Sequence, residues 1–264
     1  MELSVGGRKA YAYNAGRAPD SARPSVVFVH GAGLDHSFWG LQSRYFAYHG
    51  RNVLSLDLPG RGRSEGPPLP AIEAMADWVI ALLDAARLQR ASVIGKSMGS
   101  LVALECAARY PLRVERIALV GTAFPMRVSK AFLDAAKDNE PVAHDMHTIW
   151  GHAPQVPLGG NPNPGMWMYG DTLARLARLA PGVLYNDLKA CNEYAGGGEA
   201  AAKVKCPALF ILGQRDQMTS PKAGQAFAQL VPGSRVVQIA PSGHSMTAES
   251  PDATLDALIG FLRA

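Results

Sequence analysis

The chain centres on the stretch Ala91-Ser92-Val93-Ile94-Gly95-Lys96-Ser97-Met98-Gly99-Ser100-Leu101. A short β-branched run ends there in a Gly-x-Ser-x-Gly pentad, and an apolar, alanine-rich stretch with helical character follows to about Tyr110. A strand, a sharp turn and a helix around such a pentad indicate a nucleophile elbow, which places the Ser97 hydroxyl at the carboxyl end of a central strand. The alternative is a glycine-flanked serine that only caps the helix.

The expected turn has two physical consequences. It forces Ser97 into a strained backbone conformation, which costs about 1–3 kcal/mol. Gly95 and Gly99 lack a Cβ, so the strand and the helix can approach each other closely on either side of the serine. The N-terminus of the helix also favours negative charge that develops near Ser97.

Strands and helices alternate along most of the chain, which predicts an α/β protein with a mostly parallel, doubly wound central sheet. Continuous apolar runs such as 25–30 are typical of strands that are covered on both faces. Besides the strand that ends at the pentad, we expect strands at 3–5, 10–13, 25–30, 52–57, 114–120, 208–213 and 235–239. We expect helices at 38–49, 72–86, 101–110, 222–230 and 252–262.

The alternation stops between residues 124 and 202, where no convincing strand occurs. This segment is too long for an ordinary connection, so we expect a helical cap inserted after the sixth strand, over the carboxyl edge of the sheet. The core domain would then comprise residues 1–123 and 203–264, and the cap or lid would comprise 124–202. Within the cap we expect helices at 130–137, 171–179 and 183–194, and a Pro/Gly-rich loop at 154–165.

Composition narrows the function classes. The formal net charge of the 264 residues is +4, but Lys and Arg are scattered, so we expect no nucleic-acid partner. No apolar run is long enough to span a bilayer, and residues 1–13 lack the apolar core of a secretory signal. Cys106, Cys191 and Cys206 form neither a disulfide framework nor a metal-binding pattern. We expect a cytoplasmic protein, monomeric or homodimeric, that takes a small-molecule substrate.

The expected strand ends carry the residues that can do chemistry. In an open α/β sheet, ligands bind beyond the carboxyl ends of the strands. A serine, an aspartate and an imidazole follow such strands in the chain order typical of this fold. The strand ends deliver His30-Gly31-Ala32, Asp57, Ser97, Gly121-Thr122, Asp216 and His244.

With these motifs the chain resembles the serine hydrolases of the α/β-hydrolase fold, of a capped, carboxylesterase-like kind. The resemblance extends from the third strand to the last helix, and the joint occurrence of its motifs in order is highly specific. The motifs are His30-Gly31-Ala32-Gly33, Asp57-x-Pro59-Gly60-x-Gly62-x-Ser64, Gly95-Lys96-Ser97-Met98-Gly99, Gly213-x-x-Asp216 and Gly243-His244.

The resemblance implies a catalytic triad and an oxyanion hole. Ser97 would be the nucleophile, His244 the base that activates it, and Asp216 the carboxylate that orients the imidazole. The backbone N–H groups of Met98 and Ala32 would form the oxyanion hole. We expect no metal and no cofactor.

Several other polar residues are expected to have structural roles and not catalytic ones. The resemblance makes Asp57 structural, and His30 is expected to brace the loop that follows it. Lys96 could lower the pKa of a neighbour or contact the substrate, but we expect it to be solvated or ion-paired. The histidines at 36, 49, 144, 147 and 152 show no metal-ligand spacing. The segment 31–33 lacks the third glycine and the acidic residue of a dinucleotide-binding loop.

The expected cap is rich in large apolar side chains. Most of them would pack the cap on the core, but methionines and aromatic residues in a loop segment suit an adaptable pocket wall. We expect the wall to include Trp150, Met166, Trp167 and Met168, and the substrate to carry a small to medium apolar acyl or alcohol group.

Three functions stay open at the level of the sequence. The first is hydrolysis of a carboxylic ester through an acyl-enzyme. The second is carbon–carbon bond hydrolysis by an enzyme of the same fold, for which Ser245 after His244 is a poorer match. The third is a ligand-sensing protein that keeps the fold and turns over slowly. Dehalogenases and epoxide hydrolases of this fold would carry aspartate in place of Ser97.

Overall fold

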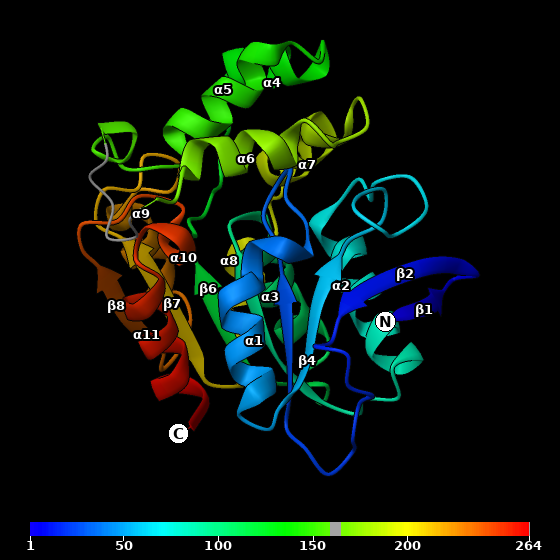
Figure 1. Ribbon diagram of the computed structural model, residues 1–264. Helices are drawn as coiled ribbons and strands as arrows, with labels where there is room; N and C mark the ends of the chain where they lie inside the picture. The colour runs from blue at the N-terminus through cyan, green and yellow to red at the C-terminus, as the bar shows by residue number, and fades with distance from the viewer. Residues whose placement is uncertain (159–164, 264) are drawn as a thin grey trace.

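An eight-stranded sheet forms the centre of the computed structural model, which describes residues 1–158 and 165–263 (Figure 1). The strand order is β1-β2-β4-β3-β5-β6-β7-β8. β1 pairs antiparallel with β2 and β2 with β4, and all other neighbours are parallel. The predicted mostly parallel sheet is therefore confirmed. The strands are β1 (Glu2–Val5), β2 (Arg8–Tyr13), β3 (Ser25–Val29), β4 (Asn52–Asp57), β5 (Ala91–Lys96), β6 (Val114–Val120), β7 (Ala208–Gly213) and β8 (Arg235–Ile239).

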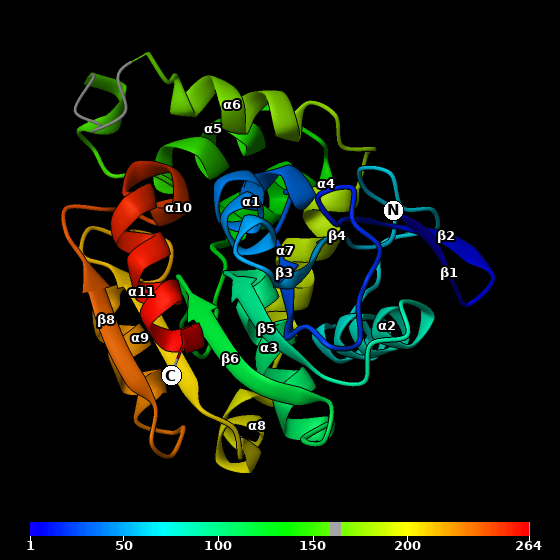
Figure 2. The same ribbon diagram turned by 60° about the horizontal axis from the view of Figure 1, so that its bottom comes forward.

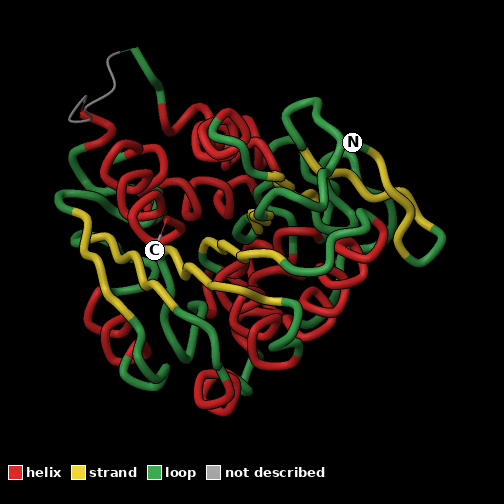
Figure 3. Tube along the Cα trace, turned by 90° about the horizontal axis from the view of Figure 1, so that it is seen from below, coloured by secondary structure: helices red, strands yellow, loops and turns green. Residues whose placement is uncertain are grey.

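Helices cover both faces of this sheet, which explains why its central strands are apolar throughout. Val26 and Phe28 of β3 belong to one hydrophobic cluster with Trp39, and Val27 and Val29 belong to the other. Seen from below, the strands cross between helices that lie on their two sides (Figure 3). The helices of the core are η1 (His36–Trp39), α1 (Gly40–Tyr48), α2 (Ile72–Ala85), α3 (Met98–Arg109), α9 (Pro221–Ala228), α10 (Met246–Glu249) and α11 (Pro251–Arg263).

The order of the strands places a crevice beside β3. The chain passes from β3 to β4 on one side of it and then returns to β5 on the other side. The loops after β3 and β5 diverge at such a reversal, and the space between them is where ligands bind in open α/β sheets. These two loops contain residues 30–33 and the pentad around Ser97.

The segment 124–202, called the insertion below, lies between β6 and β7. Its elements are α4 (Lys130–Lys137), α5 (Pro141–Trp150), η2 (Val156–Leu158), α6 (Met168–Leu176), α7 (Val183–Glu193) and α8 (Gly197–Lys203). α4 to α7 stand beyond the carboxyl ends of the strands (Figure 1), whereas α8 packs on α3 at the flank of the core (Figure 2). No helix in the described ranges 1–158 and 165–263 is both long and apolar enough to cross a membrane.

Two helices of the insertion, α5 and α8, lie outside the helical stretches expected from the sequence, and α6 begins three residues earlier than expected. Pro141 at the first turn of α5 is a helix-start signal, so the sequence does contain a signal that predicts this helix. The loop expected at 154–165 contains η2, and its residues 159–164 lie outside the described part of the chain.

The turn between β5 and α3 depends on close backbone contact. Ser97 has a φ of 53° and a ψ of −119°, a conformation that L-residues rarely adopt. A Cβ on Gly95 would collide with the carbonyl group of Gly99, and a Cβ on Gly99 would collide with the carbonyl oxygens of Val29 and His30. The two glycines therefore let α3 begin directly against β3 and β5.

We predict that Gly95→Ala lowers the free energy of unfolding by about 3 kcal/mol or more, because backbone atoms cannot move away from the new methyl group. Gly260→Ala is the matched control: Gly260 is helical and exposed, and a Cβ there meets nothing within 4 Å. This control should gain up to about 1 kcal/mol from helix propensity. Chemical denaturation of both variants measures the difference, and equal stabilities would contradict the prediction.

Candidate active site

Ser97 lies at the edge of a cavity of about 340 Å³ between the core and the insertion. His244 and Ala32 line the same cavity, together with side chains from α4, α5 and α7. The cavity is thus lined by Ala32 after β3, Ser97 after β5 and His244 after β8, although these residues are far apart in the sequence. They meet there because the parallel strands end at the same edge of the sheet.

His244 and Asp216 form a buried pair. Nδ1 of His244 donates to Oδ2 of Asp216 at 2.7 Å, and both side chains are at most 1% exposed. The carboxylate also accepts the N–H groups of Met218 and Thr219 and the hydroxyl of Thr219. Burial opposes ionisation of Asp216, but the imidazole and these hydrogen bonds outweigh it and lower the pKa of the carboxyl. Asp216 is therefore anionic and its orientation is fixed.

The bond to Asp216 sets the tautomer of the imidazole. Because Nδ1 carries the proton, Nε2 of His244 offers a lone pair. Nε2 is buried and has no hydrogen-bond partner in the described part of the chain, so the structure does not close a hydrogen bond to Ser97. Such bonds are often long in empty active sites and tighten when substrate binds. The structure thus brings Ser97, Asp216 and His244 together. It shows the expected hydrogen bond between His244 and Asp216, but not the one between His244 and Ser97.

The loop after β3 presents a free backbone N–H. The carbonyl oxygen of Gly31 accepts Nδ1–H of His30 at 2.8 Å and the N–H of Leu34 at 3.2 Å. In a trans peptide the C=O and the following N–H point in opposite directions, so the N–H of Ala32 faces away from His30. Neither this N–H nor that of Met98, the first residue of α3, has a partner among residues 1–158 and 165–263. His30 braces the loop as the sequence predicts.

Lys96 differs from its expectation. It is 2% exposed and makes no ion pair with any described residue, so the prediction of a solvated or ion-paired lysine is wrong. Its Nζ lies 5.4 Å from the centre of the Phe38 ring. Burial lowers the pKa of Lys96 to about 8, while the charges of Asp216 and Glu249 partly oppose the shift. The strand β5 buries this side chain because helices cover both faces of the sheet.

Glu249 is a residue of this site that the sequence analysis missed. Its Oε2 accepts the N–H groups of Gly243 and Ala153, both at 3.0 Å, and its Oε1 accepts the N–H of Ser245 at 3.1 Å. The carboxyl group therefore holds the backbone on both sides of His244 and joins it to the insertion. A glutamate in a four-residue helix carries no sequence signal for this role.

The insertion forms the apolar wall of the cavity. Trp150 lines it and meets Phe132 edge-on, with 5.6 Å between the ring centres. The other three residues expected in the wall lie elsewhere. Met166 and Trp167 are 42% and 74% exposed, and Met168 is buried in a small separate cluster. Apolar composition alone did not separate the wall of the cavity from the outer surface.

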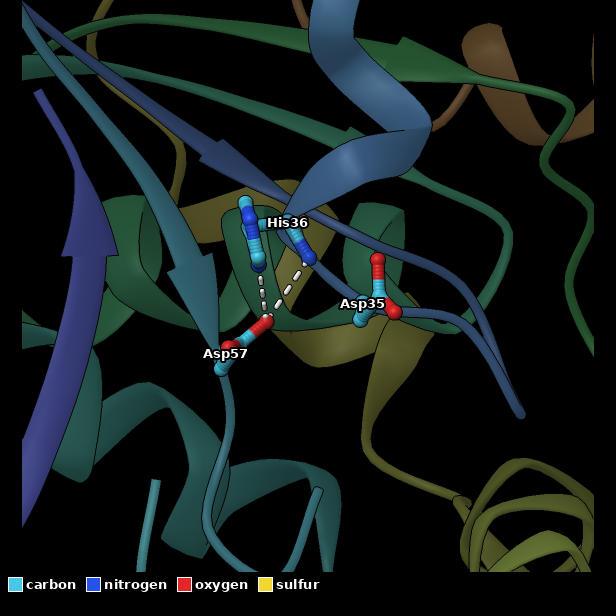
Figure 4. Close-up of side chains that lie close together, drawn as sticks. All are labelled: Asp35, His36 and Asp57. Atoms are coloured by element: carbon cyan, nitrogen blue, oxygen red, sulfur yellow. Dashed lines mark hydrogen bonds and ion pairs between the residues drawn. The ribbon is translucent and has the colours of Figure 1, made fainter. Parts of the chain in front are cut away.

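Asp57 lies outside the cavity lining and organises the turn after β4 (Figure 4). Its Oδ1 accepts the N–H and Nδ1–H of His36, both at 2.8 Å, and its Oδ2 accepts the N–H of Arg63. Asp35 stands close to this pair, and its Oδ1 binds the N–H and hydroxyl of Ser37. These hydrogen bonds account for the cluster of Asp35, His36 and Asp57, and Asp57 has the structural role expected of it.

The sheet, its strand–turn–helix serine and the imidazole at the same edge define an α/β hydrolase. The chain belongs to the alpha/beta hydrolase family, whose model matches residues 26–257. It is 30% identical to the pimeloyl-[acyl-carrier protein] methyl ester esterase of Neisseria meningitidis serogroup C over 86% of this chain and 88% of that one. It is 23% identical to the (E)-2-((N-methylformamido)methylene)succinate hydrolase of Acinetobacter baylyi, over 90% of this chain and 89% of that one. The enol-lactonase of Burkholderia xenovorans LB400 superimposes with a TM-score of 0.86 and 25% identity over both full chains.

We predict that Lys96→Met raises the pKa of His244. Burial lowers that pKa below its ordinary 6.5, Asp216 raises it, and the ammonium group of Lys96 lowers it again. Removing the ammonium group removes the repulsion that disfavours the imidazolium, whereas burial stays the same. NMR titration of the His244 ring measures the shift, with the exposed Lys205→Met as control. A pKa that is unchanged or lower in Lys96→Met would contradict the prediction.

Proposed function

We propose that the protein hydrolyses carboxylic esters with a small to medium apolar group through an acyl-enzyme on Ser97. The observation that carries the proposal is the unprotonated Nε2 of His244, set by the 2.7 Å bond from Nδ1 to Asp216, at the cavity that Ser97 lines. An esterase and an enol-lactonase among the similar proteins support ester chemistry.

In this mechanism Nε2 of His244 takes the proton of the Ser97 hydroxyl as the oxygen attacks the carbonyl carbon. The N–H groups of Ala32 and Met98 stabilise the oxyanion of the tetrahedral intermediate. The imidazolium gives the proton to the departing alcohol, which leaves an acyl-enzyme. Water then attacks the acyl group, with His244 again as the base, and Asp216 stays ionised throughout. Because the pKa of His244 is lowered, the base form persists below pH 6.5.

We assign the insertion the role of a cap. α5 and α7 supply Trp150 and Leu188 to the cavity, and α4 supplies Phe132. Met126 and Met218 add flexible apolar surface. These apolar side chains suit an apolar acyl group, while Arg127, Ser129 and Gln217 add polar groups to the same lining. The cap boundaries, 124 and 202, stay a prediction, as do the monomeric or homodimeric state and the cytoplasmic location, which gel filtration and cell fractionation would measure.

Replacement of the nucleophile tests the mechanism. We expect Ser97→Ala to lower kcat for p-nitrophenyl butyrate by about 10⁴-fold or more, because the variant lacks the hydroxyl that forms the acyl-enzyme in this mechanism. The unfolding midpoint should stay close to that of the parent protein, and the exposed Ser21→Ala is the activity control. Undiminished hydrolysis by Ser97→Ala would refute the proposal.

The same preparation separates the alternatives. A stoichiometric burst of p-nitrophenol with negligible later turnover across an ester panel would favour a ligand-sensing protein. Product analysis with a vinylogous diketone beside a simple ester would reveal carbon–carbon bond hydrolysis.

The size of the pocket gives a further prediction. Trp150→Ala should shift the preference for p-nitrophenyl esters by at least two carbons toward longer acyl chains, because the indole ring lines the cavity beside Phe132 and its removal enlarges the space. Trp167→Ala is the matched control, since Trp167 is 74% exposed and does not line the cavity. The ratio of kcat/KM between acetate and octanoate esters measures the effect. An identical chain-length profile in both variants would exclude Trp150 from the wall.

A further inference from the structure

The peptide group between Ala32 and Gly33 is held at both ends by the insertion. Nε2–H of His147, in α5, donates to the carbonyl oxygen of Ala32 at 3.0 Å. The N–H of Gly33 donates to Oδ2 of Asp187, in α7, at 3.0 Å. Both side chains are buried, at 5% and 0% exposure. One peptide plane of the loop after β3 is thus fixed by two helices that lie more than 100 residues further along the chain.

Asp187 cannot move freely, because a second buried group holds it. Nη1 and Nη2 of Arg61 donate to its two oxygens at 2.5 and 2.7 Å, and these side chains are 1% and 0% exposed. The bidentate geometry fixes the plane of the carboxylate. Separating such a pair would leave an uncompensated buried charge, which is strongly unfavourable. Arg61 follows β4, so the pair also joins α7 to the core.

In its contact with the carbonyl oxygen of Ala32, His147 can only be the hydrogen-bond donor. A carbonyl oxygen only accepts, so Nε2 must carry the proton, and Nδ1 has no partner in the described part of the chain. Burial and the charge of Lys96 lower the pKa of His147 to about 3. The side chain is therefore neutral at any working pH, and its contribution is a directed hydrogen bond and not a charge.

The loop after β3, residues 30–33, receives these contacts and is called the oxyanion loop below. It has little conformational rigidity of its own. Gly31 and Gly33 flank Ala32, and Gly33 has a φ of +68°. The peptide before Ala32 is held by His30 from the core, and the peptide after it is held by the insertion. The N–H of Ala32 lies in the plane of the first of these peptides, and the second peptide restrains that plane through the Cα of Ala32, where the two meet.

We propose that His147 and Asp187 are positioning residues that orient the oxyanion loop, so that the oxyanion hole is complete only when α5 and α7 are seated on the core. This inference rests on the proposed ester hydrolysis. The N–H of Ala32 interacts most strongly with the oxyanion of the transition state, and displacement of a catalytic group by about 1 Å can cost 10²-fold in rate. A loosened loop therefore lowers kcat and leaves substrate binding nearly unchanged.

The test compares His147→Phe with His147→Gln. His147 itself lines the cavity, and phenylalanine keeps a ring there and beside Phe132 but cannot donate to Ala32. The amide nitrogen of glutamine can stand where Nε2 stands. We expect His147→Phe to lower kcat about 10- to 100-fold with KM within about threefold, and His147→Gln to recover most of the loss. Affinity for a trifluoromethyl ketone, which forms the oxyanion on Ser97, should fall in parallel with kcat.

Asp187→Asn gives a second, independent test. Asparagine keeps the size of the side chain, but its single oxygen cannot serve Gly33 and both nitrogens of Arg61. We expect a loss of kcat and of trifluoromethyl ketone affinity, again with little change in KM. A rise in KM at constant kcat, or lower kcat with unchanged inhibitor affinity, would overturn the inference in either variant. Full activity in these variants beside an inactive Ser97→Ala would overturn the inference alone, whereas an active Ser97→Ala would refute the proposed function.

Discussion

The close contact of backbone between β5, α3 and β3 is the constraint on which the site depends. Gly95 and Gly99 allow it, and Ser97 takes up the strained turn between them. The strain persists because the rest of the fold surrounds it: Ser97 is followed by a helix that is buried almost completely between the sheet and α2. A strain energy of about 1–3 kcal/mol is small compared with the free energy that these elements gain by burying apolar surface together. The core therefore stabilises a backbone conformation that Ser97 would not adopt alone.

The polar groups near the cavity show how this fold buries charge. Asp216 and Glu249 each accept several hydrogen bonds, and Arg61 pairs with Asp187 in bidentate geometry. Lys96 is the exception, since it is buried with no ion pair in the described ranges, and its lowered pKa is the physical result. The charges of Asp216 and Glu249 partly oppose this lowering. The positive charge of Lys96 also disfavours the imidazolium of His244, which keeps this residue in the form that the proposed mechanism needs.

Local sequence patterns determined which parts could be predicted. β4, β6, β7 and β8 have the expected bounds, because apolar runs between turn residues mark them. Ser97 and His244 line one cavity, and Asp216 binds the ring of His244, because each of the three follows a strand of the same sheet. His147 and Asp187 gave no such signal. Their contacts with the oxyanion loop join residues 115 and 154 positions apart, and a polar residue on an amphipathic helix is normally expected to face solvent.

The insertion combines two roles on the same helices. In α5, Trp150 faces the cavity one turn after His147, which holds the loop; in α7, Leu188 faces the cavity directly after Asp187. On α5 and α7, side chains that line the cavity therefore lie within about one helical turn of the two side chains that hold the loop after β3. Any substitution that shifts α5 or α7 to admit a larger acyl group also shifts the peptide between Ala32 and Gly33. Under the proposed mechanism, substrate range and transition-state stabilisation are therefore coupled through α5 and α7, and the buried pair of Arg61 and Asp187 joins α7 to the core.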